Sequence, residues 1–155
     1  MPNLHAALLL IVSGLLVPLA SQAQDRQPFQ VEVWAVRATT KNKDVAPELR
    51  ELAKSLQKQF KYTGFKLERR TSQRAEQGKP FTTTLIEGYE VKITPQARAD
   101  GDKQVKLDIE VTKREGQKQT SVLKCTVTNR AGTLVPYGCG SLANDDYLIM
   151  AIRAR

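Results

Sequence analysis

The chain has 155 residues and a formal net charge of +8, from 24 Lys and Arg against 16 Asp and Glu. This length predicts one domain of ordinary size and excludes two domains that fold independently. Every charged residue follows Ala23, so the basic balance belongs to the rest of the chain. That balance favours polyanions, anionic membrane or cell-wall surfaces, or acidic proteins as partners, and it does not indicate a fold.

Residues 1–23 have the pattern of a secretory signal peptide. An apolar run over residues 6–19 precedes Ser21, Gln22 and Ala23, a small-x-small pattern that predicts cleavage after Ala23. We therefore expect a periplasmic or extracellular domain of residues 24–155 without a transmembrane span. An uncleaved anchor is the alternative, although the apolar run is shorter than the ~20 residues that cross a bilayer.

Residues 29–36 predict the first strand, because apolar and polar side chains alternate and the second face is also partly apolar. Asp44 would cap a helix that has Pro47 in its first turn. Apolar residues then recur at spacings of three and four, which predicts an amphipathic helix. This stripe consists of Val45, Leu49, Leu52, Leu56 and Phe60.

A basic surface accompanies this helix and the strand after it. Cations recur at helical spacing away from the apolar stripe and continue into residues 65–70. The functional interpretation is a docking surface for an anionic partner with salt-dependent binding, and the alternative is a solvated helix face. Nucleic acid is disfavoured as a partner because few aromatic residues are interleaved. The candidate partner-binding residues are Arg50, Lys54, Lys58, Lys61, Lys66, Arg69 and Arg70.

Strand alternation dominates the remainder of the chain. Residues 82–94 and 105–112 each place apolar side chains on one face only, whereas residues 147–152 are apolar on both. The last segment therefore predicts a central strand that the helix covers on one face. The predicted fold is α+β: a mostly antiparallel sheet of about six or seven strands, with one amphipathic helix after the first strand.

Both cysteines lie in residues 119–141, where Asn129 to Thr133 give a turn signal between two β-prone arms. If Ala131 to Thr133 form a three-residue loop, Cys125 faces Cys139 in the resulting hairpin. In an exported chain this register predicts one disulfide. Two buried free thiols are the alternative.

Catalytic motifs are weak in this chain. The one histidine is His5, so a domain cleaved after Ala23 has no imidazole for Ser-His or Cys-His catalysis or the usual zinc sites. Ser121 and Lys124 match the S-x-x-K spacing, but a strand would place them on opposite faces. The two cysteines are not a C-x-x-C redox motif.

The acidic residues have structural interpretations too. Residues 100–102 and 144–146 could offer oxygen ligands to calcium, but both segments stand where turns are expected. Asp108 and Glu110 share the outward face of a strand with Lys106, which is typical of a solvated surface and not of a glycosidase pair. We expect no catalytic residue, metal ligand or cofactor.

The C-terminal third resembles a known family. Residues 121–127 (SVLKCTV), 132–140 (GTLVPYGCG) and 147–152 (YLIMAI) resemble the closing strands of the secretin β-domain of bacterial secretion pores. In that family a paired glycine ends the middle strand, whereas here Cys139 separates Gly138 from Gly140. The chain is also similar to short exported bacterial domains of unknown function. The resemblance implies a cell-envelope setting.

The leading functional hypothesis is a non-enzymatic exported domain that binds a protein or an anionic cell-envelope component. The alternative is a small envelope hydrolase that uses carboxylates or a metal.

Overall fold

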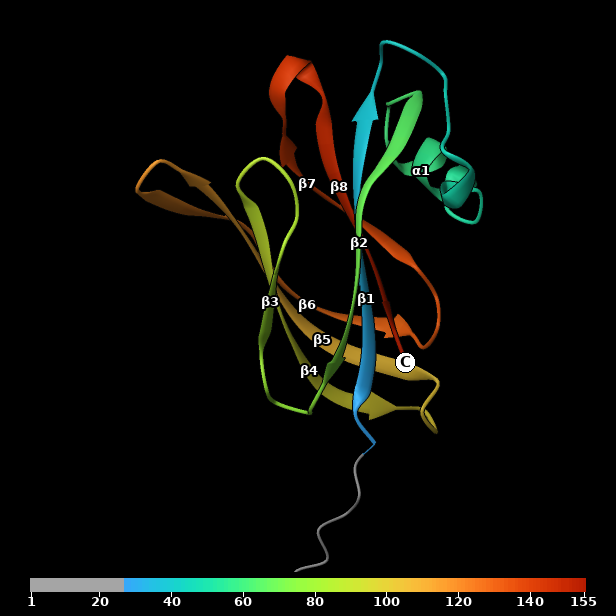
Figure 1. Ribbon diagram of the computed structural model, residues 1–155. Helices are drawn as coiled ribbons and strands as arrows, with labels where there is room; N and C mark the ends of the chain where they lie inside the picture. The colour runs from blue at the N-terminus through green and yellow to red at the C-terminus, as the bar shows by residue number, and fades with distance from the viewer. Residues whose placement is uncertain (1–26) are drawn as a thin grey trace, which may run out of the picture.

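The computed structural model describes residues 27–155, which form two four-stranded antiparallel sheets and a helical layer (Figure 1). Sheet A has the order β2-β1-β8-β7, and sheet B has the order β3-β4-β5-β6. Sheet A comprises β1 (Phe29–Thr39), β2 (Gly64–Ala75), β7 (Val135–Ser141) and β8 (Tyr147–Ala154). Sheet B comprises β3 (Phe81–Thr84), β4 (Tyr89–Ala99), β5 (Gln104–Glu115) and β6 (Lys118–Arg130). The helical segments are η1 (Pro47–Leu49), α1 (Ala53–Gln59) and η2 (Ala143–Asp145).

The larger core lies between the two sheets. Alternate residues of β1 and β8, such as Val33 and Met150, pack against alternate residues of β4 and β5, such as Ile93 and Ile109. All four side chains are at most 2% exposed. This arrangement follows from the period of two along a strand, which sends every second side chain to the same face.

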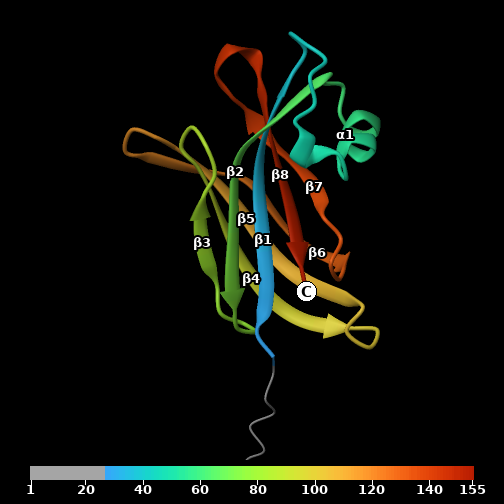
Figure 2. The same ribbon diagram turned by 45° about the vertical axis from the view of Figure 1, so that its right-hand side comes forward.

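A second core lies on the other face of sheet A. Here Trp34 of β1 and Ile149 of β8 pack against Leu49, Leu52 and Leu56 of the helical layer. Figures 1 and 2 both show α1 beside β2 and β8, on the opposite side of sheet A from β4 and β5. Sheet A is therefore buried on both faces, whereas sheet B is buried on one.

The predicted class is confirmed in its main features: the described residues are mostly antiparallel sheet with one α-helix after the first strand. The partly buried second face of residues 29–36 and the central position of residues 147–152 are also confirmed, because β1 and β8 contribute to both cores. The arrangement differs in one respect. The strands form two sheets of four in place of a single larger sheet.

The helix is shorter than the sequence pattern predicts. Ala46 takes the N-cap position of η1 and makes no side-chain capping bond, so the prediction that Asp44 caps the helix is wrong. The α-helix begins only at Ala53, after a turn. The apolar stripe is nonetheless correct, since its five residues all pack in the second core.

The predicted hairpin between residues 119 and 141 is wrong. β6 pairs with β5, where Ile109 faces Cys125, and β7 pairs with β8, where Tyr137 faces Met150. The turn near Gly132 carries the chain from sheet B to sheet A, and the Gly132 amide donates to the Ala154 carbonyl. Both arms had a better partner strand next to them in sequence, so the turn signal marked a change of sheet.

The signal-peptide prediction, with cleavage after Ala23, concerns residues outside the described range. Within residues 27–155, no helix has the length and apolar character needed to cross a membrane.

Candidate functional site

Four of the seven predicted partner-binding cations lie together on the helical layer. Arg50 follows η1, Lys54 and Lys58 lie on α1, and Lys61 lies just beyond its end. All four are exposed, and none makes an ion pair within residues 27–155. Lys54 and Lys58 are four residues apart within α1, which places them on the same side of the helix, and Arg50 and Lys61 flank its two ends. We call these four residues the helix cations.

The other three predicted cations lie on β2 and engage other parts of the protein. The Arg70 guanidinium lies 4.9 Å from the Trp34 ring centroid and forms a 2.5 Å ion pair with Glu32. Arg69 donates to the Thr84 carbonyl of sheet B at 3.3 Å. Lys66 lies 3.8 Å from Glu68.

The β2 cations also point in different directions. Arg70 pairs with Trp34 across the ladder and so shares the helix side of sheet A. Arg69 pairs with Ala35, which faces sheet B. The seven predicted residues therefore do not all lie on one side of sheet A, and the helix cations, unlike Lys66 and Arg70, make no ion pair within residues 27–155.

A charge cluster on sheet A explains why the helical layer keeps this excess of cations. Glu32 accepts from the Trp34 indole at 2.6 Å and pairs with Arg153 at 3.3 Å. Arg153 in turn holds Glu51, the acid next to Arg50, at 2.8 Å. Residues 47–61 contain two acids, Glu48 and Glu51. Because Arg153 of β8 pairs with Glu51, only Glu48 offsets the charge of the helix cations within this segment.

The pKa of Glu32 is lowered by this surrounding. Burial acts in the opposite direction, but the hydrogen bond from Trp34 and the charges of Arg70 and Arg153 outweigh it. Glu32 therefore stays ionised and ties β1, β2 and β8 to one another.

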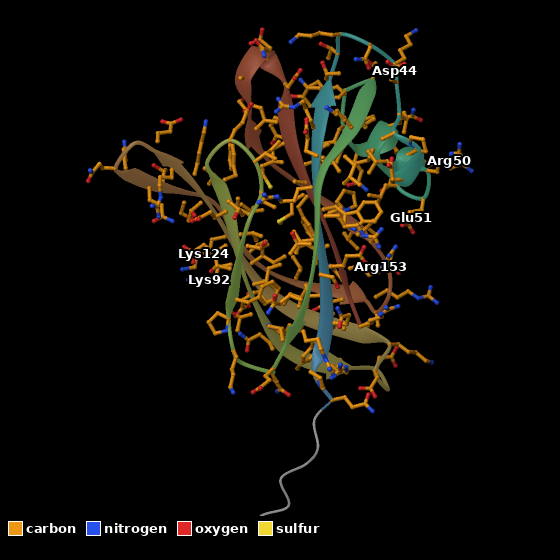
Figure 3. The ribbon with its side chains drawn as sticks, viewed as in Figure 1. Asp44, Arg50, Glu51, Lys92, Lys124 and Arg153 are labelled. Atoms are coloured by element: carbon orange, nitrogen blue, oxygen red, sulfur yellow. The ribbon has the colours of Figure 1, made fainter. Side chains whose placement is uncertain are left out.

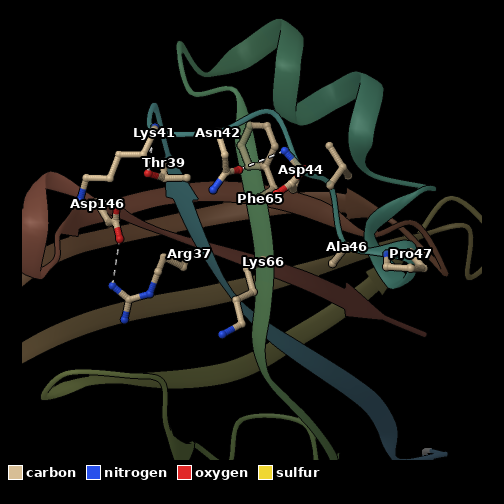
Figure 4. A pocket seen from close by; sticks show the side chains of 11 residues that line it. Arg37, Thr39, Lys41, Asn42, Asp44, Ala46, Pro47, Phe65, Lys66 and Asp146 are labelled. Atoms are coloured by element: carbon tan, nitrogen blue, oxygen red, sulfur yellow. Dashed lines mark hydrogen bonds and ion pairs between the residues drawn. The ribbon is translucent and has the colours of Figure 1, made fainter.

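An open pocket of about 470 Å³ lies beside the end of β1 (Figure 4). Its walls come from Arg37 and Thr39 of β1, Phe65 and Lys66 of β2, residues 41–42 and 44–47, and Asp146. Arg37 lies at the centre of a second charge cluster here. It binds Glu68 at 2.8 Å, Glu87 at 3.1 Å and Asp146 at 3.4 Å, and so joins sheet A to the turn between β3 and β4.

Arg37 and the carboxylates that bind it hold charge strongly. A hydrogen bond from the Ala143 amide, followed by the Arg37 contact, lowers the pKa of Glu87. At Asp146 burial opposes the shift, but a hydrogen bond from Thr39 and the charges of Lys41 and Arg37 lower the pKa. The hydrogen bond to Glu68 raises the pKa of Arg37 further above its usual range. Arg37, together with Lys41 beside Asp146 and Lys66 beside Glu68, opposes the three carboxylates, so the formal charges of the cluster balance.

The outer face of sheet B carries a different distribution of charge. Lys92 of β4 pairs with Glu110 of β5 at 2.9 Å, and Glu110 faces Lys124 of β6. Asp108 accepts from Thr126 at 2.6 Å. Figure 3 shows Lys92 and Lys124 on this sheet, well away from Arg50 and Glu51 on the helical layer. The turn interpretation of residues 100–102 is supported, because Asp100, Gly101 and Asp102 all adopt positive φ between β4 and β5.

Both cysteines are free thiols in the structure, contrary to the predicted disulfide. Cys125 is half-buried on β6, and Cys139 is buried on β7. They contribute to the same inter-sheet core from different sheets, and the predicted cross-strand register does not exist. Burial raises the pKa of Cys125, and it raises the pKa of Cys139 to about 12. Such thiols stay protonated and unreactive at neutral pH.

Among the described residues, no group of three or more His, Cys, Asp and Glu side chains is arranged to hold a metal ion. Comparisons with protein-family models, curated proteins and solved structures found no match for this chain.

Proposed function

We propose that this protein is a non-enzymatic exported domain that binds an anionic partner through the helix cations. The observation that carries the proposal is that Arg50, Lys54, Lys58 and Lys61 are exposed and unpaired within residues 27–155, while the β2 cations and Arg153 are engaged in internal contacts. Unpaired cations on one surface attract polyanions and acidic surfaces, and the attraction weakens with salt.

The partner class follows from the export signal in the sequence. The pattern at residues 1–23 supports an envelope setting, where anionic lipid or polymer surfaces and acidic proteins are both present. The contact rests on a rigid support, because Leu49, Leu52 and Leu56 are at most 2% exposed and fix the helical layer to sheet A.

The test uses a triple charge reversal, Lys54→Glu, Lys58→Glu and Lys61→Glu. The probes are vesicles that contain phosphatidylglycerol, for an anionic envelope surface, and poly-L-glutamate, for an acidic protein. We expect the wild-type protein to bind at least one probe at low salt and to release it as salt rises, because screening shortens the reach of exposed charges. The triple variant should lose this binding.

A matched control carries the same change of charge on β5 and the turn before it: Lys103→Glu, Lys106→Glu and Arg114→Glu. These three residues are exposed and make no ion pair within the described chain. Equal loss in both triple variants would show a response to net charge alone and would overturn the assignment to the helix cations. Binding that both variants retain would overturn it as well.

The alternative of a small envelope hydrolase has less support. A general acid needs a carboxyl group with a raised pKa, whereas the pKa values of Asp146 in the pocket wall and of Glu87, which binds Arg37, are lowered. One oxygen of each carboxylate also pairs with Arg37. We therefore propose a binding function alone.

A further inference from the structure

Sheet B ends at β6, and the outer edge of this strand has no partner in the described chain. β6 pairs with β5 on its inner side. Within residues 27–155, the backbone of Lys118–Asn129 makes no hydrogen bond outside that pairing. Every second residue of this segment therefore presents its N–H and C=O groups to solvent, which is the template that a further strand needs.

The other three sheet edges are less suited to pairing. β3 has only four residues. β7 contains Pro136, Gly138 and Gly140 and has a register shift between the two glycines. β2 is irregular where it passes Ala35 and Val36. By contrast, the part of β6 from Leu123 to Arg130 pairs without interruption and contains neither Pro nor Gly, so it is a regular edge eight residues long.

The apolar side chains of this edge are incompletely covered. Leu123, Cys125 and Val127 pack against the inter-sheet core but stay half-buried. Their cross-strand neighbours on β5, which are Val111, Ile109 and Leu107, are at most 1% exposed. A strand added beyond β6 would extend the core by one strand and cover the three side chains, which favours its binding.

The charge of this region selects the partner. No Asp or Glu occurs between Gly116 and Leu142, whereas Lys118, Lys124 and Arg130 lie on β6 itself. Lys124 and Arg130 face Glu110 and Gln104 of β5 and belong to the outer face of the sheet. An incoming strand with acids on that face would place carboxylates beside both cations.

The same charges oppose pairing with a second copy of β6. In any register, two β6 strands bring only cations and neutral residues together, because the segment has no carboxylate to offer. Antiparallel pairing centred on Lys124 would place Lys124 opposite Lys124 and Lys118 opposite Arg130. Like charges directly opposite one another destabilise a strand pair. Edge cations of this kind prevent self-association and still admit an acidic strand.

We propose that the edge of β6 from Leu123 to Arg130 binds an extended, acidic segment of another protein, which adds to sheet B as a fifth strand. Backbone hydrogen bonds supply affinity in this mode of recognition, and the alternate side chains supply specificity. The segment alternates apolar residues, which face the core beside Leu123 and Val127, with Asp or Glu, which face Lys124 and Arg130. This site is separate from the helix cations, so it adds a second contact to the proposed function.

The test measures binding of labelled nine-residue peptides to the full protein by fluorescence anisotropy. One peptide alternates Val with Glu, a second alternates Val with Lys, and a third is the Val-Glu peptide with alternate backbone nitrogens methylated. N-methylation removes ladder hydrogen bonds and keeps the charge. We expect the Val-Glu peptide to bind at least about tenfold more tightly than either of the others, since a tenfold change corresponds to the loss of one or two hydrogen bonds.

Protein variants then locate the site. Lys124→Glu with Arg130→Glu should weaken Val-Glu peptide binding by about tenfold or more, because cross-strand charge pairs change from attractive to repulsive. Lys106→Glu with Arg114→Glu is the matched control, since both residues are exposed on the neighbouring strand β5 and the change of charge is the same. The Lys54, Lys58 and Lys61 triple variant should bind the peptide as the wild type does. Amide hydrogen exchange should slow within Leu123–Asn129 when the peptide is bound.

Three results would overturn the proposal. Equal binding of the N-methylated peptide would show attraction without strand addition. Loss of binding in the helix-cation variant, with the β6 variant unaffected, would assign the peptide to the helix cations. Concentration-dependent dimers that the Lys124→Glu and Arg130→Glu changes abolish would make a second copy the occupant. Failure of vesicle or poly-L-glutamate binding at the helix cations would leave this site unaffected, so the two proposals can fail separately.

Discussion

Sheet A and sheet B have the same number of strands, but their sequences obey different rules because they are buried differently. In β8 of sheet A, the consecutive residues Ile149 and Met150 face opposite cores, and neither is exposed. In β5 of sheet B, Ile109 is buried whereas its neighbour Glu110 pairs with Lys92 on the outer face. A strand that is buried on both faces, such as β8, therefore has an uninterrupted apolar run, whereas a strand that is buried on one face, such as β5, alternates apolar and polar residues.

Charged residues beside the doubly buried sheet A also differ from those at the periphery in how many charged partners they have. Beside sheet A, Glu32 and Arg37 each bind two or more oppositely charged groups and connect several elements. At the periphery, the helix cations make no ion pair within residues 27–155, and neither do Lys118, Lys124 and Arg130 of β6, although Lys124 faces Glu110. Charged residues near the doubly buried sheet hold the fold together, and those farther out can meet a partner.

The largest expected effect on the free energy of unfolding comes from truncating core side chains. These changes test whether both faces of β8 but only one face of β5 are buried. Ile149→Ala and Met150→Ala in β8, and Ile109→Ala in β5, should each reduce the free energy of unfolding by about 2–5 kcal/mol. Lys106→Ala on the outer face of β5 should change it by less than about 0.5 kcal/mol. Urea unfolding followed by circular dichroism and by the fluorescence of Trp34, the one tryptophan, provides the measurement.

We expect the two signals in that experiment to coincide, because β1 and β8 belong to both cores. A Trp34 transition that precedes the circular dichroism transition would show that the helical layer separates from sheet A on its own. In that case the two cores would unfold separately, although β1 and β8 contribute to both.

Removal of Arg37 should have the next largest effect. Arg37→Met leaves Glu68, Glu87 and Asp146 without their shared cation, and we expect a loss of about 1–2 kcal/mol at pH 7, allowing for partial exposure. Glu87 and Asp146 have lowered pKa values in the folded protein, so their contribution is complete above the ordinary values of 4.5 and 3.8. It is lost as the pH falls below them.

The difference between Arg37→Met and the wild type should therefore shrink between pH 7 and pH 3. Urea midpoints at several pH values measure this trend. Lys66→Met is the control, because Lys66 is 73% exposed and lies 3.8 Å from Glu68. A difference that stays constant with pH would show that Arg37 contributes through packing of its aliphatic stem.

The two cysteines, one in each sheet, should differ in reactivity. Burial raises the pKa of Cys139 in sheet A to about 12 and also raises that of the less buried Cys125 in sheet B. We expect iodoacetamide at pH 8 to label Cys125 at least about tenfold faster than Cys139, since the thiolate is the reacting form. Peptide mass spectrometry of the labelled protein gives both rates. If the intact mass measured without reductant is lower than the mass of the reduced protein by two hydrogen atoms, the two cysteines form the disulfide that the sequence predicts.

The smallest expected effect concerns the helix cations. The triple change of Lys54, Lys58 and Lys61 to Glu should shift the urea midpoint little, since each exposed substitution is worth at most about 0.5 kcal/mol. Thermal and urea unfolding of the variant check this expectation. A loss comparable to that of Ile149→Ala would show that the lysine stems cover apolar surface of the helical layer.

Elements with one-dimensional patterns were predictable from the sequence. The alternation at residues 105–112 and the spacing of Leu49, Leu52 and Leu56 each reflect burial on one face, which depends on local period alone. Pairing was not predictable in the same way. The odd-numbered residues of β6 suit either neighbour, and a turn containing Gly132 serves a hairpin and a change of sheet equally well.

In the candidate site, too, features set by local period were predictable and contacts between distant strands were not. Exposure of the helix cations follows from their position opposite the apolar stripe, and the structure agrees. The engagement of Arg70 and Arg69 was hidden, because their partners Glu32 and Thr84 come from other strands. The Arg37 cluster was hidden as well, since its carboxylates lie 31, 50 and 109 residues away in sequence.

The position of β1 has a consequence for the order of folding. β1 lies between β2 and β8, and its pairing with β8 joins Val31 to Ala154, from the two ends of the described chain. Sheet B, by contrast, is built from strands that follow one another, so its hairpins close short loops. We expect sheet B to form early and the β1–β8 pairing to form late, as contacts distant in sequence do. Until the last strand docks, the apolar faces of β1 and of the helical layer stay exposed, which makes this the stage most prone to aggregation.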